Sequence, residues 1–327
     1  MLTEQPAVRE KHIKRLRKSQ MLMAMVVAVV IFGLGGLVNA SFVSPTNIGS
    51  ILSMAVLLGL AAAGQTLVVI AGGEGIDLSV GAVMSLGAVL AAQTMKGQNA
   101  NILPALVLVL ACGAVVGMFN TIGILFARVP PLVMTMAMAN VVTTVQLIYT
   151  HGSPFGLPAP VIASIGSKRL LPFLPWLVVL GIIAVFLLQF LLHRTSYGRQ
   201  LYAVGSNFQA AQIAGIRAAL VRGIAYVLSG ILSAVAGFWL IAYNNFVFVN
   251  MGAAYVLPSV AAVVIGGTSL AGGSGSYTGT MIGSIVLTAL GGLLVVLHTD
   301  EAGRQIINGL VLIMLLAAYT RQPPLRQ

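Results

Sequence analysis

"VVIAGGEGIDLSVGAVMSLGAVL", residues 68–90, sets the fold class of this chain. An apolar run ends in a glycine-rich segment that holds Glu74 and Asp77, and a second apolar run follows. Before residue 300, these two are the only acidic residues outside the N-terminal tail. Irregular backbone at membrane depth is tolerated only where it is buried in protein or lines a water-filled cavity. The stretch therefore indicates a membrane protein whose helices are interrupted.

The composition supports a membrane protein along the whole length. Of the 327 residues, 58% are hydrophobic and only 7% are charged, against roughly 25% charged in soluble domains. Apolar stretches of about 20 residues recur, which is the length of a bilayer-spanning helix. The short alternating segments of a β-barrel do not occur. We therefore expect an all-α polytopic membrane protein.

Hydropathy predicts about ten transmembrane helices. The first apolar run could be a signal peptide with "VNA" at its cleavage site, but its full spanning length favours an uncleaved helix. Around the spans we expect a basic tail (1–20), one transmembrane domain (21–322) and a C-terminal tail (323–327). The predicted spans are 21–40, 48–70, 78–95, 102–126, 131–150, 174–192, 219–242, 255–270, 277–297 and 304–320.

The net charge of +11 lies in short loops and tails, so it indicates membrane orientation and no nucleic-acid partner. Cytoplasmic loops of membrane proteins are enriched in Lys and Arg. With a cytoplasmic N-terminus, 13 of the 17 basic residues fall inside. Both termini are therefore predicted to be cytoplasmic. The inside residues are Arg9, Lys11, Lys14, Arg15, Arg17, Lys18, Arg128, Arg194, Arg199, Arg217, Arg222, Arg321 and Arg326, and the outside ones are Lys96, Lys168, Arg169 and Arg304.

The longest inside loop, 193–218, is predicted to contain a short surface helix. In "NFQAAQIAG", Asn207 is a favoured N-cap and Gly215 a favoured stop. Such a helix could lie on the lipid surface or could dock a cytoplasmic partner, and the spacing alone does not decide between them.

A second glycine-rich segment echoes the first. "VVIGGTSLAGGSGSYTGTMIGSIVL" begins at Val263 and again joins an apolar span to a helix of small residues. Transporters often carry internal repeats whose interrupted segments lie near the pathway. The predicted topology places both breaks toward the cytoplasmic side. The candidates for the translocation path or its gate are Gly72, Gly73, Asp77, Ser79, Gly266, Gly267, Thr268 and Ser269.

Asp77 allows three interpretations. Its carboxylate can cap the helix that follows, by accepting from the amide of Ser79 or Val80. It can form a gate or contact a polar solute. Glu74 and Asp77 can also carry a coupled proton, because intramembrane carboxylates are functional candidates. Asn140 and Gln146, within a span, can bond a polar solute or a neighbouring helix.

The sequence shows no catalytic constellation. "GGTSLAGGSG" lacks the Lys-Ser/Thr ending of a phosphate-binding P-loop, and neither zinc-ligand spacing nor a nucleophile motif occurs. The lone Cys112 excludes an internal disulfide framework. We therefore expect no enzymatic activity, no metal and no cofactor in this chain.

Four stretches, in order, resemble the permease subunits of bacterial ABC importers for ribose, xylose, arabinose, galactose and similar sugars. They cover the core of nearly the whole chain. They are "GIDLSVGAV" (75–83), "GRQLYAVGSNFQAAQIAGI" (198–216), "YVLSGILSAVAG" (226–237) and "AAVVIGGTSLAGGSGSYTGTMIG" (261–283).

The resemblance implies about ten helices and a pair of permease subunits in the bacterial inner membrane. It also implies a cytoplasmic ATPase that holds ATP and Mg²⁺, commonly with two fused nucleotide-binding domains, and a periplasmic binding protein that delivers the sugar. The stretch 198–216 is similar to the family's cytoplasmic coupling helix, which docks into the ATPase. The matching positions are Gly198, Gly205, Asn207, Ala210, Ala211 and Gly215.

One feature departs from the family. Its usual Gly-Gly-Ile-Asp-Leu-Ser is interrupted here by Glu74 and Gly75, so no solute-contacting role is carried over to Glu74. The expected function is import of a small polar solute, most simply a monosaccharide, by alternating access. The alternative is an ion- or proton-coupled secondary carrier that uses Glu74 or Asp77. Within the importer class, a furanose signal, a polyol, a nucleoside or a branched-chain amino acid remain open.

Overall fold

The protein is described from a computed structural model. The structure describes residues 6–300, 302–307, 309–310 and 313, with the backbone alone described for 6–20. The long helices are α1 (Pro6–Val38), α2 (Pro45–Ile70), α4 (Ile102–Leu125), α5 (Pro131–Thr150), α7 (Trp176–Arg194), α10 (Ala218–Asn244) and α12 (Tyr277–Val296). The shorter helices are α3 (Val80–Met95), α6 (Pro160–Ser167), α8 (Ser196–Ser206), α9 (Phe208–Ile213) and α11 (Val256–Ile265).

Short elements complete the chain. Three 3₁₀ turns are η1 (Ala40–Val43), η2 (Asn99–Asn101) and η3 (Ala253–Tyr255). Strands β1 (Arg169–Leu171) and β2 (Leu174–Pro175) form an antiparallel pair. Within the described residues the all-α prediction is therefore confirmed, apart from this small hairpin.

Seven of the described helices are long and apolar enough to cross a membrane. The predicted spans 78–95 and 255–270 are instead shorter apolar helices, Val80–Met95 and Ala253–Ile265. Helix α3 begins two residues after the start of the predicted span 78–95, and α11 ends five residues before the end of the predicted span 255–270, because Gly267 has a φ of +81°, outside helical backbone. Most of the predicted span 304–320, and the tail 323–327, lie outside the described residues. Helix α1 begins at Pro6, so it continues through most of the predicted tail 1–20.

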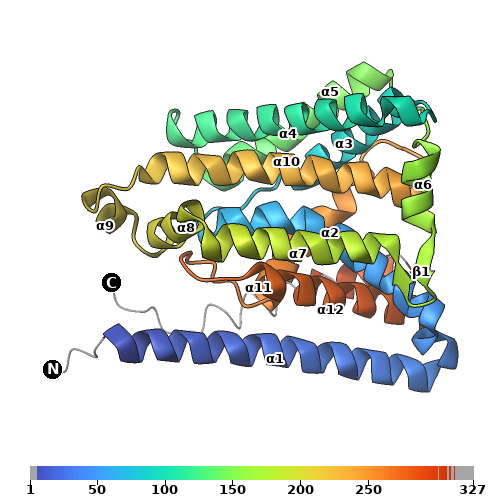
Figure 1. The fold of residues 1–327 in the computed structure, drawn as a ribbon, viewed down its shortest axis with the longest axis horizontal. Helices are drawn as coiled ribbons and strands as arrows, with labels where there is room; N and C mark the ends of the chain where they lie inside the picture. Colours follow the sequence, from blue (N-terminus) through green and yellow to red (C-terminus); the bar gives the residue numbers. More distant parts are fainter. Residues whose placement is uncertain (1–5, 301, 308, 311–312, 314–327) are drawn as a thin grey trace.

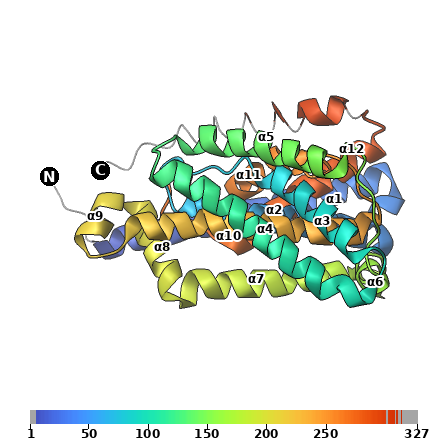
Figure 2. The same ribbon diagram turned by 90° about the horizontal axis from the view of Figure 1, so that it is seen from above.

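The long helices run roughly along one axis and leave two distinct ends (Figures 1 and 2). The N-terminal end of α1 lies at the same end as α8 and α9, while α6 and β1 lie at the opposite end (Figure 1). The single-chain bundle therefore presents the loop 193–218 on one end of the molecule.

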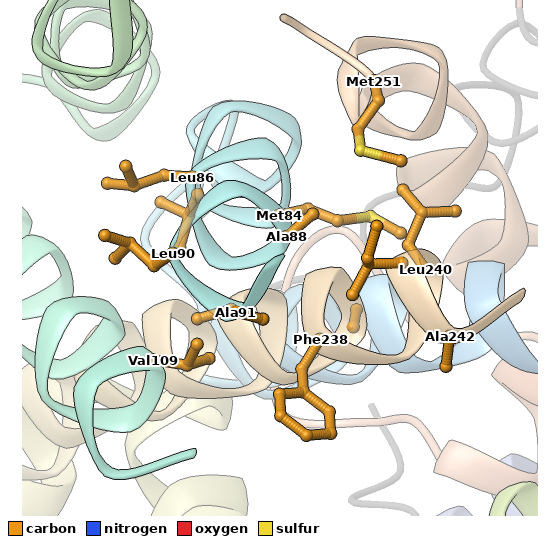
Figure 3. Packing of buried hydrophobic residues seen from close by; sticks show 14 of the residues in the cluster. Met84, Leu86, Ala88, Leu90, Ala91, Val109, Phe238, Leu240, Ala242 and Met251 are labelled. Carbon is orange, nitrogen blue, oxygen red and sulfur yellow. The ribbon is translucent and has the colours of Figure 1, made fainter. Parts of the chain in front are cut away.

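Helices α2 and α10 form the centre of the bundle. The membrane-length window of α2 is 94% buried, against 17% for α5. Helix α10 packs on α2, α3 and α4, and Figure 3 shows Val109 of α4 beside Ala91 of α3, and Met84 of α3 beside Leu240 of α10. Because α2 and α10 are enclosed by the other helices, most of their side chains lie inside the protein.

Small residues let α10 approach its neighbours closely. A β-carbon on Gly237 would lie 1.9 Å from the carbonyl oxygen of Met84, and one on Gly230 would lie 2.1 Å from that of Gly113. Close backbone approach through small residues is the usual way membrane helices associate, since lipid offers no hydrophobic driving force between them.

Candidate functional site

Break 1, residues 71–79, separates α2 from α3 and departs from helical geometry at its start. Gly72, Gly73 and Glu74 have φ of +72°, +68° and +56°. This left-handed region favours glycine, and Glu74 adopts it as an exposed side chain. The break predicted from the sequence is therefore confirmed.

Break 2, residues 266–276, separates α11 from α12 in the same manner. Gly267, Gly272 and Gly273 have positive φ. The amide of Ser269 donates to the carbonyl of Ser274 (2.9 Å), closing the loop, and the hydroxyl of Ser276 caps α12 by accepting from Gly279 N. The predicted echo of a span, a glycine-rich break and a small-residue helix is therefore present twice.

Between these breaks in sequence, the loop 193–218 forms two helices, α8 and α9. The hydroxyl of Thr195 caps α8 by accepting from Gly198 N (3.1 Å). Asn207 caps α9 by accepting from Ala210 N (2.9 Å), and Gly215 ends the turn at φ +82°. The short helix predicted at 207–215 is confirmed in position and in both of its ends.

Helix α8 is fixed to the bundle at both of its ends. The hydroxyl of Tyr202 donates to the carbonyl of Gly275 in break 2 (2.9 Å), and that of Tyr197 donates to Val221 O on α10 (3.3 Å). Burial raises the pKa of Tyr197 above its ordinary value, so the hydroxyl stays a donor. A displacement of α8 therefore acts directly on break 2.

Four glycines bring α8 and both breaks into backbone contact, and we call Gly72, Gly205, Gly272 and Gly273 the glycine junction. The amide of Gly273 donates to Ile70 O at the end of α2 (2.9 Å). A β-carbon on Gly205 would lie 1.8 Å from that oxygen and 2.5 Å from that nitrogen. A β-carbon on Gly272 would lie 2.6 Å from the α-carbon of Gly72. The structure thus joins the predicted coupling loop to both predicted breaks.

Asp77, at the end of break 1, is the centre of a second cluster. One carboxylate oxygen accepts from the backbone amide (2.9 Å) and the hydroxyl (2.5 Å) of Ser79. The other accepts from the hydroxyl of Ser229 on α10 (2.7 Å). Asn120 on α4 in turn donates to the Ser79 hydroxyl (3.0 Å). One carboxylate therefore connects break 1, α4 and α10.

The backbone around Asp77 is held by two more helices. The amide of Asp77 donates to Gln65 Oε1 on α2 (3.1 Å), and the amide of Leu78 donates to the hydroxyl of Thr135 on α5 (3.0 Å). Asp77 is 1% exposed. A buried carboxylate without these donors would be costly, whereas hydrogen bonds to the charged form offset part of that cost. The predicted hydrogen bond from the Ser79 amide to Asp77 is present, but Ser79 is itself the N-cap of α3, and that helix has no side-chain capping bond.

The remaining predicted site residues divide in a simple way. Gly205 meets Gly72, while Gly266 packs against the backbone of Gly279 instead. Thr268 is fully buried against Gly275. Asp77 and Ser79 of break 1 cluster instead with Asn120 of α4 and Ser229 of α10. Ser229, Asn120 and Thr135 were not predicted as partners of break 1. The signal that could have indicated them is a small polar residue on an otherwise apolar helix.

Asn140 and Gln146 lie on different faces of α5. Asn140 is exposed and its side-chain amide donates to Met136 O, within its own helix. Gln146 is fully buried and neither side-chain polar atom has a hydrogen-bond partner among the described residues.

The chain is similar in sequence to known permease proteins. Residues 47–316 match the family described as "Branched-chain amino acid transport system / permease component". The chain is 34% identical to the ribose import permease protein RbsC of Bacillus subtilis (strain 168), over 96% of this chain and 97% of that protein. It is 32% identical to RbsC of Escherichia coli (strain K12), over 91% and 92%.

A third relative has another named cargo. The chain is 31% identical to the autoinducer 2 import system permease protein LsrC of Shigella flexneri, over 93% of this chain and 88% of that protein. No solved structure matches. The match over residues 47–316, which includes both breaks, the glycine junction and the Asp77 cluster, shows that this chain belongs to the permease-component family of branched-chain amino acid-type transport systems.

Proposed function

We propose that the chain is the membrane-spanning permease subunit of an ABC importer for a monosaccharide. The observation that carries the proposal is the glycine junction, where α8 of the loop 193–218 contacts both helix breaks. A passive membrane anchor has no need for such a connection. An importer that is driven by a separate ATPase needs such a connection, because the movement of the loop 193–218 must be transmitted to the translocation pathway.

The end of the bundle that carries α8 and α9 is the cytoplasmic end in this proposal. The N-terminal end of α1 lies there too (Figure 1), and the basic residues Arg194, Arg199 and Arg217 belong to the same loop region. Lys168 and Arg169 lie beside β1 at the other end. This distribution follows the positive-inside rule and supports the orientation predicted from the sequence.

The mechanism is alternating access. A partner ATPase binds ATP and Mg²⁺, closes and moves the docked α9. Helix α8 passes that motion to break 1 through Gly72 and to break 2 through Tyr202 and Gly273. Packed elements of this kind switch between discrete arrangements and do not deform continuously. This chain forms no covalent intermediate and hydrolyses no ATP.

The partners follow from this role. They are a second permease subunit, a cytoplasmic ATPase with two fused nucleotide-binding domains, a periplasmic binding protein and the lipids of the bacterial inner membrane. RbsC and LsrC are named for the import of ribose and of autoinducer 2, which supports an importer. The secondary carrier, with Glu74 or Asp77 as proton site, is the alternative.

Docking through α9 predicts that two substitutions uncouple transport. Ala210→Glu adds a charge to an exposed position of α9, and Gly215→Trp adds bulk where the backbone has φ +82°. Both should abolish ATP-driven uptake while the protein still inserts in the membrane and purifies as a bundle. Ala210 is exposed, and nothing packs within 4 Å of Gly215, so the strain of tryptophan at φ +82° is confined to the end of α9. Uptake and ATPase co-purification are measured together; normal uptake by both variants contradicts docking through α9.

Solute identity is tested by uptake in the host strain. We expect ¹⁴C-ribose uptake to be lost on deletion of this chain's gene and restored by the intact gene, while ¹⁴C-leucine uptake is unchanged. Loss of leucine uptake alone would replace the monosaccharide with a branched-chain amino acid, in line with the family's description. Uptake that depends on the proton gradient and continues without ATP would favour the secondary carrier.

A further inference from the structure

We propose that Arg222 is a positioning residue that links the docking helix α9 to break 1, by a path separate from the glycine junction. The proposal rests on the proposed function, because it assumes that a partner moves α9. Its substance is a three-part contact. The Phe208 ring, the Arg222 guanidinium and the backbone of break 1 lie against one another in that order.

The first contact joins α9 to α10. The guanidinium carbon of Arg222 lies 4.5 Å from the centroid of the Phe208 ring, well within the roughly 6 Å reach of a cation–π interaction. Phe208 is the first residue of α9, directly after the cap Asn207. Its ring is half-buried and packs on the core around α8 and α10. Any displacement of α9 therefore moves the ring on which Arg222 rests.

The second contact joins Arg222 to the start of break 1. One guanidinium nitrogen donates to Ala71 O (3.5 Å). A β-carbon on Gly73 would lie 2.7 Å from the guanidinium carbon. Glycine at position 73 therefore suits both the φ of +68° and the guanidinium, which would have to move if a β-carbon were present.

Arg222 belongs to the face of α10 that holds break 1 at both ends. Ser229, seven residues further along, donates to Asp77 at the far end of the same break. Positions seven apart lie on one face of a helix. The polar side chain between them on this face, Tyr226, is fully buried. Helix α10 thus contacts the first residues of break 1 through a cation and the last through a hydroxyl.

The contacts of α10 with the two ends of break 1 differ in strength, and the weaker one determines which end moves. Asp77 accepts short hydrogen bonds inside a sealed core. Arg222 makes one long hydrogen bond and a ring contact, and its Nε has no partner among the described residues. The Arg222 end of break 1 is therefore the end that yields when α9 moves, while the Asp77 end stays fixed.

The test measures movement of break 1 itself. Glu74 is exposed within the break, and Cys112 is the single cysteine. A spin label on Glu74→Cys in a Cys112→Ala background therefore reports on break 1 alone. The label is observed in the reconstituted complex with its host ATPase, without nucleotide and with a non-hydrolysable ATP analogue. We expect a nucleotide-dependent change in label mobility in the otherwise native chain.

Two variants should remove that change while the ATPase stays bound. Phe208→Leu keeps an apolar anchor but loses the ring, and Arg222→Gln keeps a donor but loses the cation. Each should lower ATP-driven uptake by about tenfold, within the usual range of coupling between sites. Phe208→Tyr, which keeps the ring, should behave as the native chain. Arg128→Gln, an exposed arginine after α4, is the matched charge control.

The outcomes separate this proposal from the proposed function. If the native chain fails to retain an ATPase, the proposed function has failed. If the ATPase is retained and Phe208→Leu and Arg222→Gln still show the nucleotide-dependent change, or if Phe208→Tyr loses it, the link through Arg222 is wrong. Loss of the change in Arg128→Gln as well would mean that the effect is one of charge and not of this contact.

Discussion

Gly205→Ala is expected to lower ATP-driven uptake by about tenfold or more, within the usual range for coupling between sites. The added β-carbon would lie 1.8 Å from Ile70 O and 2.5 Å from Gly273 N. These two atoms are the partners of the hydrogen bond that joins α2 to break 2. Both are backbone atoms, so no side chain can rotate away to make room, and overpacking adds about 1–3 kcal/mol of destabilisation. Uptake and the thermal midpoint of the purified chain are measured together.

The matched control for Gly205→Ala is Gly291→Ala on α12. A β-carbon there meets nothing within 4 Å, and alanine is the better helix former by about 1 kcal/mol. Its uptake and melting temperature should equal or slightly exceed those of the native chain. Full uptake by Gly205→Ala would mean that α8 does not need this close approach, and the glycine junction would lose its role.

Asp77→Leu should prevent stable folding, whereas Asp77→Asn should fold and transport. Leucine leaves the amide and hydroxyl of Ser79 and the hydroxyl of Ser229 without their acceptor. Each buried unsatisfied donor costs about 1–3 kcal/mol, which together consumes a large share of a typical stability of about 5–15 kcal/mol. Asparagine keeps an acceptor for Ser79, and the Ser229 hydroxyl can turn to accept from the new amide.

Membrane yield, monodispersity and uptake distinguish the roles of Asp77. Ser53→Ala on α2, which removes a hydroxyl bonded only to its own helix at Gly49 O, is the control for loss of a buried hydroxyl and should be almost silent. If Asp77→Asn folds like the native chain but transports nothing, the charge itself is needed. That result would favour the secondary carrier, with Asp77 as the proton site, over a purely structural role for Asp77.

Structural elements that are determined by residues close together in the sequence could be predicted from it. Asn207 and Gly215 delimit α9 because a cap and a left-handed glycine act within a few residues. Both glycine-rich breaks were predicted for the same reason. The end of α11 was not, because hydropathy averages over residues whose backbone has already left the helix at Gly267.

Contacts between distant segments could not be predicted from the sequence. Ser229 lies 152 positions from Asp77, and Asn120 lies 41 from Ser79. A serine on an apolar helix bonds its own backbone as readily as it bonds a neighbour; Ser85 does so with Gly81. The contacts of the glycine junction could not be predicted from the sequence either. Each glycine marks a place of close approach, but only the packing of α2, α8 and break 2 shows what approaches.

The most direct test of the account is purification of this chain from its native host in a mild detergent, with the co-purified proteins identified and quantified by mass spectrometry. We predict a stoichiometric ATPase that carries two nucleotide-binding domains, together with a second permease subunit, and loss of that ATPase from the Ala210→Glu variant. A monodisperse native chain that retains no ATPase under any mild condition would contradict the account, since α9 would then have nothing to dock and the secondary carrier would become the leading interpretation.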